Sequence, residues 1–187
     1  MTNTKITFSI MSYEKNEDIR ILTSCLSKWF SNPKILHFTS PSMRYPFKME
    51  QWKSLSKSSQ STTLVIKSDN WILGHISIIM NNETKSAHIF HLIIDPKQQQ
   101  KGYGGKLISF AEKFILKNNF KTITLNVLKK NQVAIKLYEA TNLKPISSPY
   151  ISVGRIYEKI GDFKKAIIFY SKNIEKSYLD LLDFLKN

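Results

Sequence analysis

One short stretch decides how this chain folds: QQKGYGGK, residues 99–106, which lies two residues after the apolar run IFHLIIDP, residues 89–96. The stretch holds three of the six glycines in the 187-residue chain. Glycine admits positive φ angles and lets a ligand approach the main chain closely. The first amides of the helix that follows lack partners inside that helix and lie at the positive end of its dipole. Such a turn binds phosphate; a plain strand-to-helix turn is the alternative.

The spacing excludes two familiar phosphate-binding motifs. A P-loop has a glycine five residues before its Gly-Lys pair and Ser or Thr after the lysine, where this chain has Gln100 and Leu107. A Rossmann fingerprint would place its third glycine at position 107, which is again Leu107. We therefore expect a phosphate-binding loop that belongs to neither of these two nucleotide folds.

The composition predicts one globular domain, with 42% hydrophobic and 12% aromatic residues. No apolar run approaches the ~18 residues of a membrane span and the N-terminus does not resemble a signal peptide, so we expect a cytoplasmic protein without a membrane partner. Cys25 is the only cysteine, which excludes an internal disulfide and a cysteine-rich metal site. No metal is expected.

The formal net charge of +14 has two interpretations. It favours a polyanionic partner or a ligand with several phosphates, or it describes a solvated, lysine-rich surface. The lysines are scattered through every segment instead of forming one block. Nucleic acid is therefore not the expected partner, although a basic nucleic-acid-binding domain stays open as an alternative.

Hydrophobic periodicity outlines an α/β (α+β) chain. Apolar residues alternate in five expected strands, recur at helical spacing in four expected helices, and leave one long irregular segment: strands 5–12, 62–67, 71–80, 87–94 and 121–128; helices 16–30, 48–56, 107–117 and 131–141; irregular residues 31–47. From residue 87 the order is strand, loop, helix, strand, helix. That order places a parallel strand pair inside an otherwise antiparallel sheet.

Two blocks of this chain resemble the GNAT superfamily of N-acetyltransferases. Gln99-x-x-Gly102-x-Gly104, after a strand, resembles the family's acyl-CoA signature Gln/Arg-x-x-Gly-x-Gly/Ala, and NQVAIKLYE, residues 131–139, resembles its Asn-x-x-Ala-x-x-Leu-Tyr-Glu helix. The resemblance covers about residues 60–145, with one departure: the family often follows the Tyr-Glu helix with Gly-Phe, where this chain has Asn142-Leu143. It implies a mixed, mostly antiparallel sheet of six to seven strands with a central splayed parallel pair, about four flanking helices, and a single domain over residues 1–187.

The resemblance also implies acetyl-CoA as the co-substrate. In the family, the loop amides hold the pyrophosphate of CoA, and the preceding strand pairs with the pantetheine arm. Carried over, this assigns cofactor binding to Leu92, Ile93, Ile94, Gln99, Gln100, Lys101, Gly102, Tyr103, Gly104, Gly105, Asn131, Ala134 and Tyr138. The last three lie at i, i+3 and i+7, and hence on one helical face.

The implied reaction is acetyl transfer to a primary amine by direct attack in a ternary complex. By resemblance, Tyr138 protonates the departing thiolate, although from the sequence alone it could equally pack on the sheet. The amide of Leu92 is the implied oxyanion donor. His88 lies eleven residues before Gln99, where histone-type members carry a catalytic glutamate. Histidine with its ordinary pKa near ~6.5 can accept a proton at neutral pH, but many members need no dedicated base.

The acceptor site is expected to form from residues 35–47 of the irregular segment, with Arg44 and Tyr45 prominent, and from the strand face near His88, because long loops often carry binding residues. His91 is expected to point away from it and to be structural. The acceptor itself is a small-molecule or protein amine, and the protein a monomer or homodimer. A catalytically silent acyl-CoA-binding or protein-interaction module on the same fold is the other open alternative.

The C-terminal part has two interpretations. Residues 153–170 resemble a tetratricopeptide repeat, but a single repeat cannot bury its own apolar face. The strands expected before residue 143 also do not include the hairpin that closes a GNAT sheet. We therefore predict that residues 143–175 form this hairpin, with strands at 151–160 and 166–171, and that a helix follows over residues 177–187.

Overall fold

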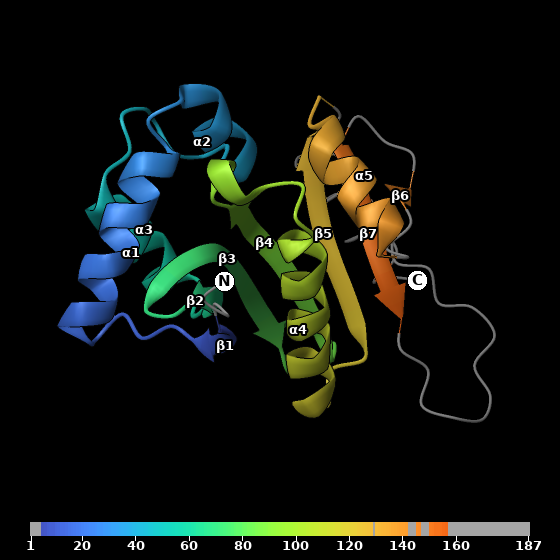
Figure 1. Ribbon diagram of the computed structural model, residues 1–187. Coiled ribbons are helices and arrows are strands. Elements are labelled where there is room, and N and C mark those ends of the chain that lie inside the picture. The colour runs from blue at the N-terminus through green and yellow to red at the C-terminus, as the bar shows by residue number, and fades with distance from the viewer. Residues whose placement is uncertain (1–4, 129, 142–144, 147–149, 157–187) are drawn as a thin grey trace.

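The computed structural model describes residues 5–128, 130–141, 145–146 and 150–156. They form one seven-stranded sheet in the order β1-β2-β3-β4-β5-β7-β6, flanked by five α-helices (Figure 1). The strands are β1 (Ile6–Ile10), β2 (Thr62–Ser68), β3 (Trp71–Asn81), β4 (Ser86–Ile94), β5 (Thr122–Leu128), β6 (Pro145–Ile146) and β7 (Tyr150–Ile156). The helices are α1 (Asn16–Trp29), α2 (Pro33–Thr39), α3 (Met49–Ser58), α4 (Tyr103–Lys117) and α5 (Gln132–Ala140), with a 3-10 turn η1 (Pro96–Gln98) before α4.

Strands β4 and β5 form the parallel pair inside an otherwise antiparallel sheet. Their pairing runs from Ser86 opposite Thr122 to Ile89 opposite Leu125 and then ends. Both strands continue, β4 to Ile94 and β5 to its own end, so they splay apart beyond the last pair. The predicted fold class, with its central splayed parallel pair, is confirmed; five helices flank the sheet where about four were expected.

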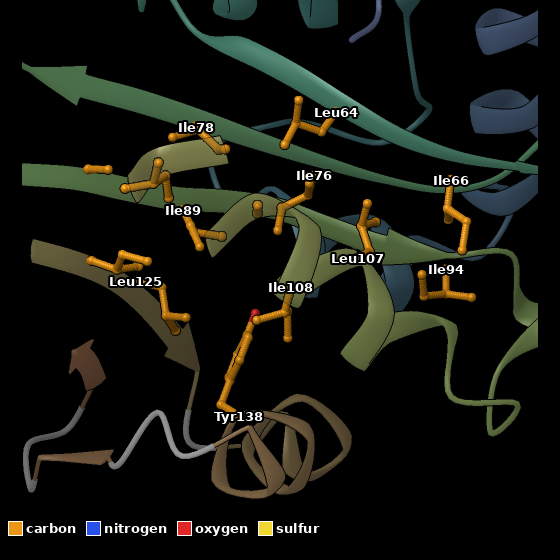
Figure 2. Close-up of a cluster of buried hydrophobic side chains, with 14 of the residues drawn as sticks. Leu64, Ile66, Ile76, Ile78, Ile89, Ile94, Leu107, Ile108, Leu125 and Tyr138 are labelled. Atoms are coloured by element: carbon orange, nitrogen blue, oxygen red, sulfur yellow. The ribbon is translucent and has the colours of Figure 1, made fainter. Parts of the chain in front are cut away.

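Strand alternation sends side chains into two separate cores, one on each face of the sheet. In β2, Leu64 and Ile66 join the core that includes Leu107 of α4, and Figure 2 shows this cluster. Val65 lies between them in sequence and joins the other core, which includes Trp52 of α3 and side chains of α1 and α2. Helices α4 and α5 therefore cover one face of the sheet, and α1 to α3 cover the opposite face.

Helix α2 lies within residues 31–47, where the sequence predicted an irregular segment, so that prediction was wrong for Pro33–Thr39. The Asn32 side chain caps the helix by accepting a hydrogen bond from the Lys34 amide at 2.9 Å, and Pro33 occupies the start of the helix. Asparagine before proline is a helix-start signal that three prolines in the segment obscured. The helix packs against β4.

The described part of the C-terminal region is a pair of strands. Strand β7 pairs antiparallel with β5, and β6 pairs with β7. Strand β7 overlaps the first strand predicted for the closing hairpin, residues 151–160, and contains residues 153–156 of the repeat-like stretch. Most of the predicted hairpin over 143–175 and the predicted helix over 177–187 lie outside the described residues and stay predictions. No helix in the described ranges has the length and hydrophobicity needed to cross a membrane.

Candidate functional site

A cavity of about 1760 Å³ lies where β4 and β5 splay apart. Its walls come from β4 after His88, from β5 after Thr124, from the loop and helix start that follow β4, and from α5 and α2. Pockets for single small molecules typically measure ~300–1,000 Å³. The cavity is therefore large enough for an extended cofactor together with a second substrate.

The glycine loop closes one end of this cavity. Gly102 is the N-cap of α4 in a left-handed conformation, with φ +77°, and a Cβ atom there would meet nothing within 4 Å. The backbone angle, and not crowding, therefore requires glycine. The Gln99 side chain fixes the loop to β4, because Nε2 donates to the Ile94 carbonyl at 3.2 Å. The Gly102 carbonyl accepts a hydrogen bond from the Lys106 amide, which is the first hydrogen bond of the helix. The amides of residues 103–105 come before it and have no partner inside the helix. These three residues line the cavity, so their amides can bind a ligand.

Almost every residue predicted to bind the cofactor lines the cavity, Lys101 being the exception. Its ammonium group donates instead to the Gln98 side chain at 2.9 Å. Gly104 has a packing reason as well, because a Cβ atom there would lie 2.9 Å from the Leu137 side chain of α5. The glycine thus lets α4 start close to α5.

Strand β4 contains a bulge at His91 and Leu92. Phe90 pairs with Ser77 and Ile93 pairs with His75, so two residues lie opposite the single residue between those partners. A bulge of this kind leaves one residue outside the ladder. On its other edge, among the residues that the structure describes, β4 has no strand partner beyond Ile89, and residues 90–94 line the cavity there.

A buried hydrogen-bond network supports the bulge from the α1–α3 side. His75 Nδ1 lies 3.2 Å from the His91 carbonyl, which can only accept, so Nδ1 carries the proton. His75 Nε2 lies 3.4 Å from the Tyr13 hydroxyl, which in turn accepts from Trp52 Nε1 at 3.1 Å. The His91 ring stacks on Trp52, with centroids 4.3 Å apart, and Nε2 lies 3.0 Å from Ser40 Oγ.

Both histidines of this network are neutral at neutral pH. Burial lowers the pKa of His75 to about 4 and the pKa of His91 to about 3. A neutral His75 ring donates at one nitrogen and accepts at the other, which matches its two partners. The prediction that His91 points away from the site was wrong, because the bulge leaves it among the residues that line the cavity. Its contacts with Trp52 and Ser40 are those of a structural residue.

His88 and Thr124 bridge the parallel pair, with His88 Nδ1 2.9 Å from Thr124 Oγ1. Burial lowers the pKa of His88, so the ring is neutral at neutral pH and keeps one unprotonated nitrogen. Both side chains line the cavity, together with Phe90 and Asn126 at the next alternate positions of the same strands. The sequence analysis missed Thr124; its alternation with Asn126 on β5 was the available signal.

Three predicted residues share the cavity side of α5. Asn131 is the N-cap, because its side-chain oxygen accepts from the Ala134 amide at 3.3 Å. Tyr138 is only 6% exposed, and Figure 2 shows it pointing from α5 toward Ile108 of α4. Burial raises the pKa of Tyr138, so its hydroxyl keeps its proton at neutral pH and can donate it. That hydroxyl has no hydrogen-bond partner among the residues the structure describes.

The structure does not bring Arg44 and Tyr45 to this cavity. The Tyr45 side chain is 54% exposed and its hydroxyl donates to the Ser31 carbonyl at 3.3 Å. The wall beside β4 comes instead from α2 and the residues after it: Lys34, Ile35, Phe38, Thr39, Ser40, Pro41 and Ser42. All of these residues except Lys34 fall within the segment 35–47 that the sequence predicted for the acceptor site. The sequence analysis missed the helix in that segment, and it singled out Arg44 and Tyr45 instead.

The family follows from a comparison with protein-family models. The model described as the acetyltransferase (GNAT) family matches residues 26–142 of the 187-residue chain. The chain belongs to the GNAT acetyltransferase family. A comparison with curated proteins found no match.

Solved GNAT structures share the fold. The spermidine N-acetyltransferase from Vibrio cholerae, in complex with CoA and spermine, is 18% identical with a TM-score of 0.65, over 81% of this chain and 95% of that chain. The ribosomal-protein-S18-alanine N-acetyltransferase from Escherichia coli is 16% identical with a TM-score of 0.61, over 87% and 100%. The PaiA N-acetyltransferase from Thermoplasma acidophilum, in complex with coenzyme A, is 18% identical with a TM-score of 0.59, over 82% and 99%.

Among the described parts of the chain, no three His, Cys, Asp or Glu side chains lie together as a metal site would require.

Proposed function

We propose that the protein transfers an acetyl group from acetyl-CoA to a primary amine by direct attack in a ternary complex. One observation carries the proposal: a cavity between splayed parallel strands is lined by a glycine loop and by the first residues of the helix that this loop begins. A mere strand-to-helix turn would require neither the left-handed Gly102 nor an open strand edge beside it.

The residues present fit acetyl-CoA in two places. The amides of residues 103–105 and the positive end of the α4 dipole suit a pyrophosphate. The open edge of β4 over residues 90–94 offers main-chain groups to the amides of a pantetheine arm, as a neighbouring strand would. The N-cap role of Asn131 leaves Ala134 and Leu137 to contact the arm from α5.

The chemistry rests on three groups that line the cavity. When bound, acetyl-CoA supplies the acetyl group as a thioester. The amide of Leu92, which lies in the bulge and lines the cavity, donates to the thioester oxygen as negative charge develops, an interaction typically worth ~10²–10³ in rate. The Tyr138 hydroxyl gives its proton to the departing sulfur, and neutral His88 accepts the proton of the attacking amine at a ring nitrogen.

A covalent acyl-enzyme is not part of the proposal. Burial raises the pKa of the Cys25 thiol to about 11, and Cys25 belongs to the core beneath α1 to α3 and does not line the cavity. A protonated, buried thiol is a poor nucleophile. The monomeric or homodimeric state and the cytoplasmic location stay predictions.

The test is thiol release from acetyl-CoA across a panel of amines, with mass spectrometry of each product and calorimetric titration of CoA. CoA binding together with acetylated product supports the proposal. CoA binding without turnover on any amine would instead identify a catalytically silent acyl-CoA-binding module. Salt-sensitive retention of DNA or RNA without CoA binding would identify a nucleic-acid-binding domain.

A further inference from the structure

One part of the cavity, which we call the acceptor end, lacks the negative charge that a binding site for polycations requires. We define this end by the cavity-lining residues of α2 and by the residues that face them from β4 and β5: Lys34, Ile35, Phe38, Thr39, His88, Phe90 and Asn126. No Asp or Glu side chain in the described residues lines any part of the cavity. The charged groups that do line it are Lys34 and Lys130.

The same end is rich in apolar and aromatic surface. Phe38 of α2 and Phe90 of β4 both line it, with Ile35 one turn from Phe38. The Lys34 ammonium lies 5.6 Å from the centroid of the Phe38 ring. A ligand that enters between α2 and β4 therefore meets two aromatic rings and a cation.

This surface disfavours a polyamine for a physical reason. Each additional ammonium group of a polyamine would lose its hydration in the cavity and find no carboxylate to replace it, which is unfavourable. It would also be repelled by Lys34, in a chain whose net charge is already +14. A monoamine with an apolar body has only one nitrogen, and that nitrogen must lose its proton to react. A site with a cation and without an anion favours the unprotonated amine, which is the nucleophile.

On the basis of the proposed function, we infer that the acceptor is a hydrophobic monoamine, a primary amine attached to an aromatic or aliphatic body, and not a polyamine. Phe38 and Phe90 contact the body of the acceptor and place its nitrogen beside His88. In the reaction the bond between nitrogen and the acetyl carbon forms and the carbon–sulfur bond breaks. The amine proton goes to His88, and the sulfur receives a proton from Tyr138.

The experiment compares 2-phenethylamine with spermidine as acceptors, at saturating acetyl-CoA, for the wild type and for Phe38→Glu. The wild type should show a kcat/KM for 2-phenethylamine at least about tenfold above that for spermidine. Phe38→Glu removes apolar surface and adds the missing carboxylate, so it should lower kcat/KM for 2-phenethylamine and raise it for spermidine. The control is Trp71→Glu, which makes the same change of charge at a side chain that is 52% exposed and does not line the cavity.

A second variant guards against misfolding of Phe38→Glu. Lys34→Glu changes an exposed residue of α2 and should also shift preference toward spermidine, while the affinity for CoA stays unchanged in both variants. Wild-type preference for spermidine would overturn the inference and leave the proposed acetyl transfer standing. CoA binding without acetylation of any amine would overturn both.

Discussion

Two identical substitutions, three residues apart, should change stability in opposite directions. Gly102→Ala places a Cβ atom on a residue with φ +77°, a conformation that costs an L-residue about 1–2 kcal/mol. No atom lies within 4 Å of that Cβ, so the cost comes from the backbone alone. Gly105→Ala lies inside α4, also with nothing within 4 Å and without a positive φ, and should stabilise the helix by up to about 1 kcal/mol.

Thermal and urea unfolding measure this difference. In a chain of this size, 1 kcal/mol corresponds to a shift in Tm of about 2–4 °C. We expect Gly102→Ala to melt below the wild type and Gly105→Ala at or above it, with unchanged urea m values. Equal losses in the two variants would refute the assignment of a left-handed cap at Gly102.

The same strain should appear in the kinetics of one substrate. In the Gly102→Ala variant, the loop conformation proposed to bind phosphate is destabilised by about 1–2 kcal/mol, so the KM for acetyl-CoA should rise by up to about 5–30-fold. The KM for the amine and kcat at saturating acetyl-CoA should stay near the wild type, because the residues that define the acceptor end come from α2, β4 and β5 and not from this loop. Equal increases in both KM values would show that Gly102 does not act through the cofactor.

Four further outcomes are expected. Tyr138→Phe should lower kcat by about 10²–10⁴ with little loss of stability, because the hydroxyl has no partner in the described residues; an unchanged kcat removes Tyr138 as the acid. His88→Ala should lower the rate between pH 6 and 9, where the neutral ring accepts a proton, and a rate profile identical to the wild type would contradict that part. In the folded protein the pKa of His75 is about 4, below its usual value of 6.5, so the unfolded state binds the proton more readily. The free energy of unfolding should therefore fall as the pH drops from 6.5 to 4. At 1.36 kcal/mol per pKa unit, the loss is about 3 kcal/mol. His75→Asn, which keeps a donor near the His91 carbonyl, should show a smaller loss over this range in urea unfolding. Cys25 should react with thiol reagents only after unfolding, which counting labelled thiols by mass spectrometry checks.

Much of the cavity wall formed by the glycine loop and α5 could be predicted because its geometry is local. The spacing of Gln99, Gly102 and Gly104 sets a turn and a helix start, and the spacing of Asn131 and Tyr138 sets one face of a helix. These relations depend on backbone geometry over fewer than three turns. The structure accordingly brings these residues to one cavity, although Lys101, placed with them by sequence position, turns toward Gln98.

The acceptor end could be predicted only in part. His88 lies on the strand and face where periodicity put it, but Arg44 and Tyr45 do not line the cavity. The sequence predicts an irregular segment there, and the position of such a segment depends on contacts with distant elements. The cap formed by Asn32 turns part of it into α2, which then supplies Phe38 to the cavity wall.

By itself the sequence determined the order of the strands and of every helix except α2, the parallel pair, the glycine loop and the cavity-facing side of α5, because periodicity and turn chemistry act over a few residues. Only the tertiary structure decided where β4 and β5 part, that β4 bulges at His91, and that Tyr13, Trp52 and His75 meet beneath that bulge. These features depend on residues as many as 62 positions apart, which no local pattern relates. For the same reason the absence of carboxylates from the described walls of the cavity, on which the choice of acceptor rests, emerged only after folding brought α2 beside β4.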